Sequence, residues 1–236
     1  MFSPSLMRLA APLAAVTALL AACGGAATPV TSDAPTAAAT TSTPAPSATA
    51  SATTVTTGTW TVSNASKATV RVREQLVGVN LPSDAVLVAT GATGTFVLND
   101  DGTFSPDSKI TFDVTTLASD QRNRDDFVKM DTLQTRQFPT ATFVPTKTSG
   151  LALPLPASGD FTFKLTGQIT IHGKTKEVTF DVTAHRSGNQ LTATTTASPT
   201  WKFADFGMTA PSVPFRVVSI VDEIRLVVDL VATVKG

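Results

Sequence analysis

The sequence contains few of the residues that most often perform catalysis or bind metal ions. Among its 236 residues there are one cysteine, two histidines and no tyrosine. A single thiol forms neither a disulfide within the chain nor a zinc site with several cysteines. The histidines, His172 and His185, do not stand at the His-x-His or His-x-x-x-His spacing of a metal site. We therefore predict no metal site and no catalytic residue.

Charge is scarce and balanced. Lysine and arginine together number 18, aspartate and glutamate number 18, and charged residues make up only 15% of the chain. No broad basic field is available to attract phosphates, so nucleic acid is not an expected partner. Hydrophobic residues make up 42% of the chain, a balance that favours an exported β-domain rich in threonine and valine.

The N-terminal segment has the pattern of an export signal. Arg8 is followed by an apolar stretch, residues 9–22, that is too short for a confident membrane span but fits a signal peptide. The quartet Leu20-Ala21-Ala22-Cys23 resembles the lipobox of bacterial lipoproteins, which implies cleavage before Cys23 and a diacylglycerol on its sulfur. We expect residues 1–22 to be the signal peptide. The alternative is an ordinary signal peptide that happens to contain a cysteine.

Residues 23–57 have the composition of a tether. From Gly24 to Thr57 nearly all residues are alanine, threonine, proline, serine or glycine, and Asp33 carries the only charge. Such a segment buries too little apolar surface to offset the entropy of ordering. The predicted protein is therefore exported and held by lipidated Cys23 at the outer face of the cytoplasmic membrane, or faces the periplasm.

Residues 58–236 show the pattern of an all-β domain. Apolar residues alternate with polar ones, as in strands with one buried face. The clearest strands are predicted near residues 60–62, 68–72, 110–114, 161–165, 178–182 and 224–230, and weaker ones near 86–89, 95–98, 140–144 and 191–196. Antiparallel strands in this number hide their edges in a sandwich or a closed barrel.

One segment has helical periodicity. Phe127, Met130 and Leu133 recur at steps of three residues, behind an Asp120 or Asn123 that could cap a helix. This predicts one short helix between two strands. The acidic and basic residues at its start are interpreted as capping and surface charges.

Four segments together resemble the polyisoprenoid-binding YceI-like family. They are Arg124-Asp125, Phe138-Pro139-Thr140-Ala141-Thr142-Phe143, the run from Leu165 to Val178, and Asp205-Phe206-Gly207-Met208. The resemblance covers residues 60–234 and implies an extended, lipocalin-like antiparallel β-barrel of about eight strands. It further implies an apolar interior that encloses a polyisoprenoid or an isoprenoid quinone as ligand, with no other cofactor.

Inward positions of the strands supply the predicted ligand-binding wall of that barrel. Ten residues are assigned to it: Phe96, Phe112, Phe143, Phe161, Phe163, Ile169, Ile171, Val178, Phe180 and Leu226. Removing a prenyl chain from water gains roughly 25 cal/mol per Å² of apolar surface. The leading functional hypothesis is a membrane-tethered lipid-binding protein; the alternatives are a filled-core envelope domain with a structural or interaction role, and an enzyme.

The hairpin around His172 has a predicted register. A four-residue loop after His172 sets Ile171 opposite Val178 and places His172 opposite Glu177 on the outer face. His172 is then interpreted as a surface residue beside the turn. His185, beside a Ser-Gly-Asn turn, is interpreted as solvated.

Overall fold

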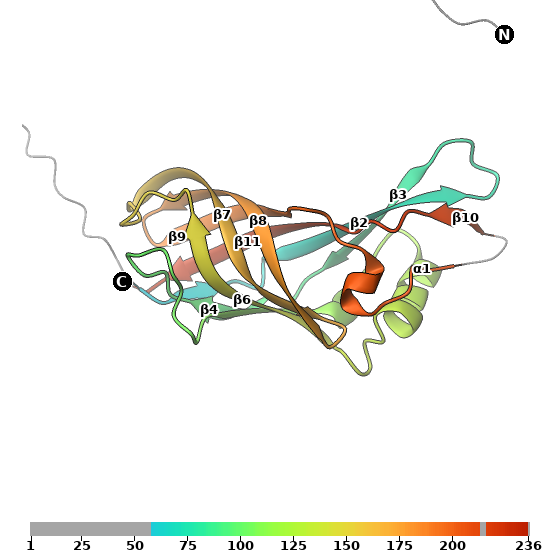
Figure 1. Cartoon of the computed structure of the whole chain (residues 1–236), viewed down its shortest axis with the longest axis horizontal. Helices are drawn as coiled ribbons and strands as arrows, with labels where there is room; N and C mark the ends of the chain where they lie inside the picture. Colours follow the sequence, from blue (N-terminus) through green and yellow to red (C-terminus); the bar gives the residue numbers. More distant parts are fainter. Residues whose placement is uncertain (1–57, 213–215, 236) are drawn as a thin grey trace, which may run out of the picture. The chain divides into compact units, whose positions relative to one another are not determined.

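The structure is a computed structural model that describes residues 58–212 and 216–235. In these residues the chain forms antiparallel strands joined by loops and helical turns (Figure 1). The first strands are β1 (Trp60–Val62), β2 (Lys67–Leu76), β3 (Ser83–Ala89), β4 (Thr93–Phe96), β5 (Lys109–Asp113) and β6 (Thr140–Ser149). The others are β7 (Ser158–Ile171), β8 (Lys174–Ser187), β9 (Gln190–Ala197), β10 (Val217–Ile220) and β11 (Arg225–Val234). The predicted signal peptide, Cys23 and the tether lie outside the described residues.

Eight of these strands close into a barrel. They follow the order β1, β4, β5, β6, β7, β8, β9 and β11, and β11 pairs with β1 to complete the ring. Trp60 of β1 joins the two ends of the ring because it lies opposite both Phe96 of β4 and Val234 of β11. Closure removes free strand edges from this part of the sheet. The predicted antiparallel barrel of about eight strands is confirmed.

At one end the sheet continues beyond the ring. β2 pairs with β11 over its first half, with β3 along one edge, and with β10 near its last residues. Leu76, which ends β2, lies opposite Val217 of β10. The loop between β2 and β3 projects from the sheet at this end (Figure 1).

Alternation in the sequence located ten of the eleven strands. Along β8, for example, Val178, Phe180, Val182 and Ala184 are buried while the residues between them are more exposed. β10 was not predicted, because its four residues include a register shift and show no alternation. Strands of that length leave too few positions for the pattern to be detected.

The predicted helical segment is helical, but it combines two kinds of turn. The helical elements are η1 (Val114–Thr116), α1 (Arg122–Phe127), the π-helical turn η2 (Val128–Thr132) and η3 (Phe203–Phe206). The predicted caps are wrong: α1 starts after Gln121, whose side chain makes no capping bond. Asp125 instead accepts hydrogen bonds from the backbone N–H and the hydroxyl of Ser119, at 2.8 and 2.6 Å, and so fixes the loop before the helix.

The register predicted for the β7–β8 hairpin is also wrong. Ile171 lies opposite Lys174, and Val178 lies opposite Gly167, four residues earlier in β7 than predicted. Only His172 and Gly173 form the turn, and both have positive φ, 49° and 70°. That pair of dihedrals is typical of a type I′ turn, whose twist matches the flanking strands. The longer loop was predicted because it pairs Ile171 with Val178 and Ile169 with Phe180, whereas the observed turn needs a positive φ at His172, which is uncommon for residues other than glycine.

The other end of the barrel is filled by aromatic side chains. The rings of Trp60 and Phe96 stack with centroids 6.1 Å apart, and Phe104 packs edge-on against Phe96 at 6.3 Å. Arg186, only 1% exposed, covers the Trp60 ring. We call this the closed end.

Candidate ligand cavity and its mouth

The interior of the barrel contains a cavity of about 940 Å³. This volume is close to the upper end of the range of volumes found for small-molecule and cofactor sites. Among the described residues, the exposed side chains that line it lie around the β2–β3 loop, the start of α1 and β10; examples are Val79, Gln121, Asn123 and Arg216. The cavity therefore opens at the end opposite the closed end, and we call this opening the mouth.

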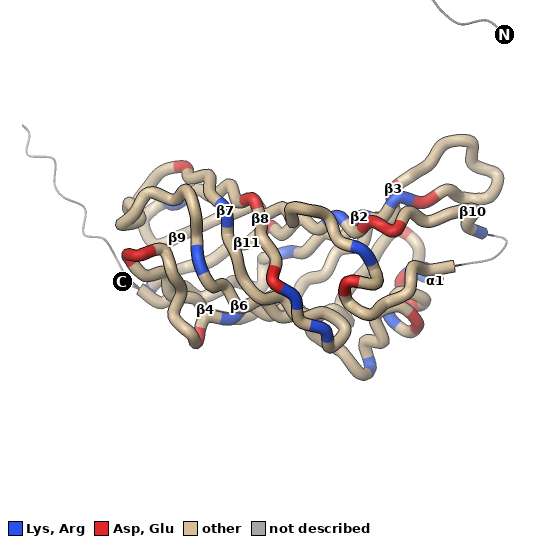
Figure 2. The backbone as a smooth tube through the Cα atoms, viewed as in Figure 1, with Lys and Arg blue, Asp and Glu red and all other residues tan. Residues whose placement is uncertain are grey.

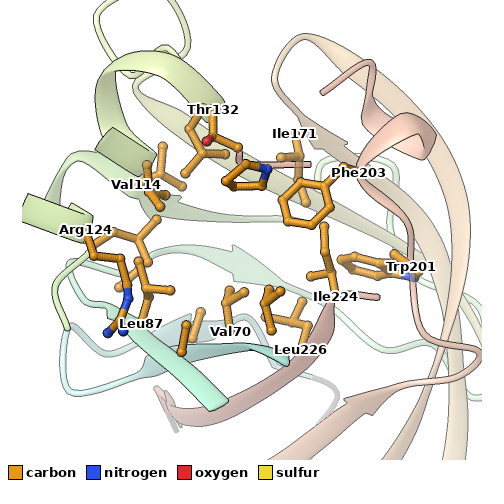
Figure 3. A pocket seen from close by; sticks show the side chains of 18 of the residues that line it. Val70, Leu87, Val114, Arg124, Thr132, Ile171, Trp201, Phe203, Ile224 and Leu226 are labelled. Carbon is orange, nitrogen blue, oxygen red and sulfur yellow. The ribbon is translucent and has the colours of Figure 1, made fainter. Parts of the chain in front are cut away.

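The walls of the cavity are apolar and come from strands on all sides. Figure 3 shows Val70 and Leu226 facing Val114 and Ile171 across the space, with Trp201 and Phe203 on one side. Such a surface offers dispersion contacts and burial to a hydrocarbon chain, and few hydrogen bonds. A long apolar ligand fits this chemistry better than a sugar or a nucleotide.

Six of the ten residues predicted for the wall line the cavity. They are Phe112, Phe143, Ile169, Ile171, Phe180 and Leu226. They come from β5, β6, β7, β8 and β11. The barrel therefore brings together side chains that are distant in the sequence, as Phe112 and Leu226 are, at a separation of 114 residues. Their contact with a ligand stays a prediction.

The other four predicted wall residues do not line the cavity. Phe96 packs on Trp60 at the closed end. Phe161 and Phe163 lie opposite Ala184 and Val182 in the half of the barrel near that end. Val178 is buried in the core without reaching the cavity. Alternation identifies the inward face of a strand, but it does not tell which inward residues fill the barrel and which border an open space.

A row of aromatic side chains completes one side of the cavity, and two of its members, Trp201 and Phe206, were not predicted for the wall. Phe143 packs edge-on against Phe180, at 5.3 Å between centroids, and Phe180 against Trp201, at 6.0 Å. Trp201 in turn contacts Phe206 at 5.2 Å. Trp201 and Phe206 lie in and beside the short turn η3, outside any strand. The family-like segment Asp205-Phe206-Gly207-Met208 was a signal for Phe206, whose side chain lines the cavity, but not for Trp201.

The mouth carries charged groups that neutralise one another. Arg124 of α1 pairs with Glu74 of β2 and with Asp120, each at 2.6 Å between nitrogen and oxygen. All three line the cavity, and the side chains of Glu74 and Arg124 are only 7% and 18% exposed. Figure 3 shows Arg124 at one edge of the apolar wall. A pair so little solvated needs both partners, because either one alone would be a buried charge.

A third carboxylate at the mouth, that of Asp84, is held by two arginines. Asp84 of β3 accepts from Arg225 at 2.7 Å and from Arg73 at 3.4 Å. The hydrogen bond from Arg225 is the main cause that lowers the pKa of Asp84, and the charges of both arginines add to it against the opposing effect of burial. This network ties β3 to β2 and β11 at the rim.

His172 does not lie where the sequence analysis placed it. Glu177, its predicted partner, lies opposite Gln168 instead. The Nδ1 atom of His172 is 3.2 Å from the carbonyl oxygen of Phe206, and its ring packs edge-on against Phe138 at 4.6 Å. Its Nε2 atom is buried and has no hydrogen-bond partner among the residues that the structure describes. His172 therefore fastens the hairpin turn to η3 and is not a solvated surface residue.

His185 lies on the outer face of β8. Its Nδ1 atom is 2.7 Å from Asp160, and its side chain is 58% exposed. Within residues 58–212 and 216–235, no three His, Cys, Asp or Glu side chains gather in a way that could hold a metal ion. In the same part of the chain no helix has the length and hydropathy to cross a bilayer.

Comparisons with known proteins agree with this architecture. Residues 47–232 match the family described as the YceI-like domain. Over 124 residues the chain is 35% identical to UPF0312 proteins of two Pseudomonas putida strains, an alignment that covers 47% of this chain and 61% of each relative. The chain thus spans about three fifths of the length of these curated relatives.

Two solved structures illustrate the shared fold. BcnA of Burkholderia cenocepacia superposes with a TM-score of 0.54 at 23% identity, covering 73% of this chain and 99% of BcnA. A domain of Saccharophagus degradans, described as polyisoprenoid binding and implicated in plant cell wall breakdown, superposes with a TM-score of 0.56 at 12% identity. Its alignment covers 75% of this chain and 98% of that domain. At these identities the likeness shows the fold.

Proposed function

The chain belongs to the YceI-like family, and from this membership and its cavity we propose that it binds a polyisoprenoid or a similar amphiphilic lipid. The lipid's hydrocarbon chain occupies the barrel, and its head group lies at the mouth. The described polyisoprenoid binding of the Saccharophagus degradans domain, which shares the fold, supports this choice of ligand.

The apolar cavity with a single polar end is the observation that carries the proposal. A prenyl chain has a long apolar surface and one polar terminus, and the cavity has the same division between its wall and its mouth. Burial of the chain removes its surface from water, at roughly 25 cal/mol per Å². The alternative of a filled-core domain predicts continuous packing along the barrel axis, and the cavity of about 940 Å³ supports lipid binding over that alternative.

The charges at the mouth favour a ligand head that is polar but uncharged. Arg124 is already paired with Glu74 and Asp120, and Asp84 with Arg225 and Arg73. A quinone or alcohol head can accept or donate hydrogen bonds at this rim without displacing an ion pair. A diphosphate would have to compete with Glu74 for Arg124.

We further propose that the protein works outside the cytoplasm, tethered to a membrane. The support is the lipobox-like quartet ending at Cys23 and the long polar tether that follows it. Two or more acyl chains give a stable anchor without a transmembrane helix. The protein would then sequester or carry a lipid close to the bilayer from which the lipid comes.

Analysis of bound lipid tests the proposed function. The complete chain, purified from a bacterium that exports it, is extracted with organic solvent and examined by mass spectrometry. We expect an isoprenoid lipid at close to one molecule per chain. A prenylquinone added in detergent solution should also bind. If the purified chain carries no isoprenoid and binds no added prenylquinone, the proposal fails.

A further inference from the structure

The exposed large apolar residues of the domain gather at one end. In the part of the chain that the structure describes there are six of them, and five lie in the β2–β3 loop or in and directly after β10. These five are Val77 (53% exposed), Val79 (46%), Leu81 (76%), Val218 (66%) and Val221 (46%). A soluble protein rarely concentrates its exposed aliphatic side chains in this way without an interaction partner.

The same residues stand beside the mouth of the cavity. Val77 and Val79 both line the cavity while half of each side chain is exposed. The backbone N–H of Val77 donates to the carbonyl of Arg216 at 3.0 Å, which holds the loop against the start of β10. We name Val77, Val79, Leu81 and Val218 the apolar tip. The inner wall of the barrel therefore continues outward onto this surface.

The apolar tip carries no charge of its own. Residues 76–83, Leu-Val-Gly-Val-Asn-Leu-Pro-Ser, contain no Lys, Arg, Asp or Glu. Figure 2 shows the projecting loop without charged residues, which begin only where β2 and β3 pair. Entry into the interface of a bilayer is favoured by aliphatic side chains and opposed by charge, so this loop can enter without moving a charge out of water.

We infer that the apolar tip docks into the surface of a phospholipid bilayer and sets the cavity mouth against the lipid. This inference rests on the proposed function, because a protein that takes up a membrane lipid needs a path that shields the hydrocarbon chain from water. The apolar tip and the cavity wall form such a path. The occupant of the patch is thus the bilayer itself.

The tether length fits this orientation. β1 begins at the closed end, where Trp60 lies opposite Val234, so the chain that leads to Cys23 leaves the barrel at the end opposite the mouth. β8 has 14 residues and spans about 46 Å along the strand, which sets the scale of the barrel's length. The 34 residues from Gly24 to Thr57 extend to as much as about 110 Å. A chain anchored at Cys23 can therefore turn its mouth to the membrane, which a tether of a few residues would prevent.

Fluorescent labels at the two ends test the inference. The complete chain carrying Leu81→Cys is labelled with an environment-sensitive dye on the new thiol and reconstituted with phosphatidylcholine vesicles. The matched control is Ala152→Cys, an exposed position in the loop whose Leu155 and Pro156 carbonyls bind Arg186 at the closed end. The parent chain, treated with the same dye, measures any labelling at Cys23, and that signal is subtracted.

If the apolar tip docks, the emission of the dye at position 81 should shift to the blue and be quenched by spin-labelled phosphatidylcholine. The dye at position 152 should keep the emission spectrum that it has in water. Aqueous spectra at both positions would overturn the inference, as would equal quenching at both. Concentration-dependent dimerisation with an aqueous spectrum in vesicles would assign the apolar tip to a second copy of the chain instead.

Lipid uptake separates this inference from the proposed function. In the double variant Leu81→Asp with Val218→Asp, neither residue of which lines the cavity, uptake of a prenylquinone from vesicles should slow by about tenfold or more, since two aliphatic contacts with the bilayer are lost. Binding of the same quinone from detergent solution should not change. Unchanged uptake from vesicles contradicts docking, whereas absence of binding from detergent in the parent chain contradicts the proposed function.

Discussion

The guanidinium carbon of Arg186 lies 5.1 Å from the centroid of the Trp60 ring, and this contact closes the barrel at the end opposite the mouth. Arg186 also donates to the carbonyls of Gly188 at 2.9 Å, Leu155 at 3.2 Å and Pro156 at 3.1 Å. Burial lowers the pKa of Arg186, yet a guanidinium stays charged at any physiological pH. The charge is therefore stabilised by carbonyl dipoles and an aromatic face.

Replacement of this arginine should destabilise the fold. In Arg186→Ala the three carbonyls lose their donor and Trp60 loses its cover, so we expect the free energy of unfolding to fall by about 2–4 kcal/mol. Urea denaturation followed by tryptophan fluorescence measures it. The control is His185→Ala, one residue away on the outer face, which should cost less than about 1 kcal/mol. Equal losses in the two variants would contradict a special role for Arg186.

Two phenylalanines of the predicted wall provide a matched test of ligand contact. Phe143 and Phe163 are both partly buried strand residues packed against the core, but only Phe143 lines the cavity. Phe143→Ala should weaken prenylquinone binding by about tenfold, which corresponds to the loss of about 1.4 kcal/mol of apolar contact. Phe163→Ala should leave the affinity within about twofold while lowering thermal stability. Isothermal titration in detergent measures the affinities, and similar losses in both would mean that cavity lining does not determine binding.

The pair of Glu74 and Arg124 should control which head group is accepted. In Glu74→Gln, Arg124 keeps only the exposed Asp120 as an ionic partner and gains the capacity to bind a phosphate. The ratio of affinity for a prenyl diphosphate to that for a prenylquinone should rise by about tenfold. Competition binding in the parent and the variant measures this ratio. A constant ratio would show that the head group does not reach Arg124.

Acid should remove the contribution of Asp84 to stability. Its pKa in the folded protein is lowered, chiefly by the hydrogen bond from Arg225, whereas an unfolded aspartate has a pKa of about 3.9. The Asp84 carboxylate therefore binds a proton more readily in the unfolded state than in the folded state. Its contribution to stability is present above about pH 4 and is lost as the pH falls through the pKa of Asp84 in the folded protein. Asp84→Asn should cost up to about 1 kcal/mol at pH 7, because these pairs are partly solvated. Urea unfolding at pH 7 and pH 3 measures the difference, which should shrink towards zero at the lower pH.

The strands and the barrel could be predicted from the sequence. Which inward residues fill the barrel and which line the cavity could not. Alternation depends only on which face of a strand is buried, so it predicted both Phe163 and Phe143 to be part of the ligand-binding wall. Whether an inward side chain meets another side chain or an empty space depends on residues from distant strands. Trp201 and Phe206 belong to no strand, so period two carried no information about them.

Arg186 shows a second limit of sequence reasoning. Its neighbour His185 was correctly placed in solvent, as the side chain is 58% exposed, but a charged residue at an inward position of β8 contradicts the usual pattern of burial. Only the approach of the Leu155 and Pro156 carbonyls, 30 residues and more away in sequence, makes that burial possible.

The two-residue turn at His172 and Gly173 yields a test of backbone geometry. A Cβ atom on Gly173 would lie 2.7 Å from Cε1 of Phe138, and its φ of 70° already disfavours other residues. Gly188 provides the control, since its φ is 57° and nothing lies within 4 Å of an added Cβ. Gly188→Ala should therefore cost only the conformational term, about 1 kcal/mol.

Gly173→Ala should cost about 1–3 kcal/mol more, because Phe138 must move and its edge-on contact with His172 is disturbed. Urea unfolding of the two variants gives the difference directly. Equal losses would show that Phe138 yields without cost, and the packing of the turn against η3 would then not depend on this glycine. A larger loss at Gly173 assigns the excess to the close contact and not to the positive φ, which the two glycines share.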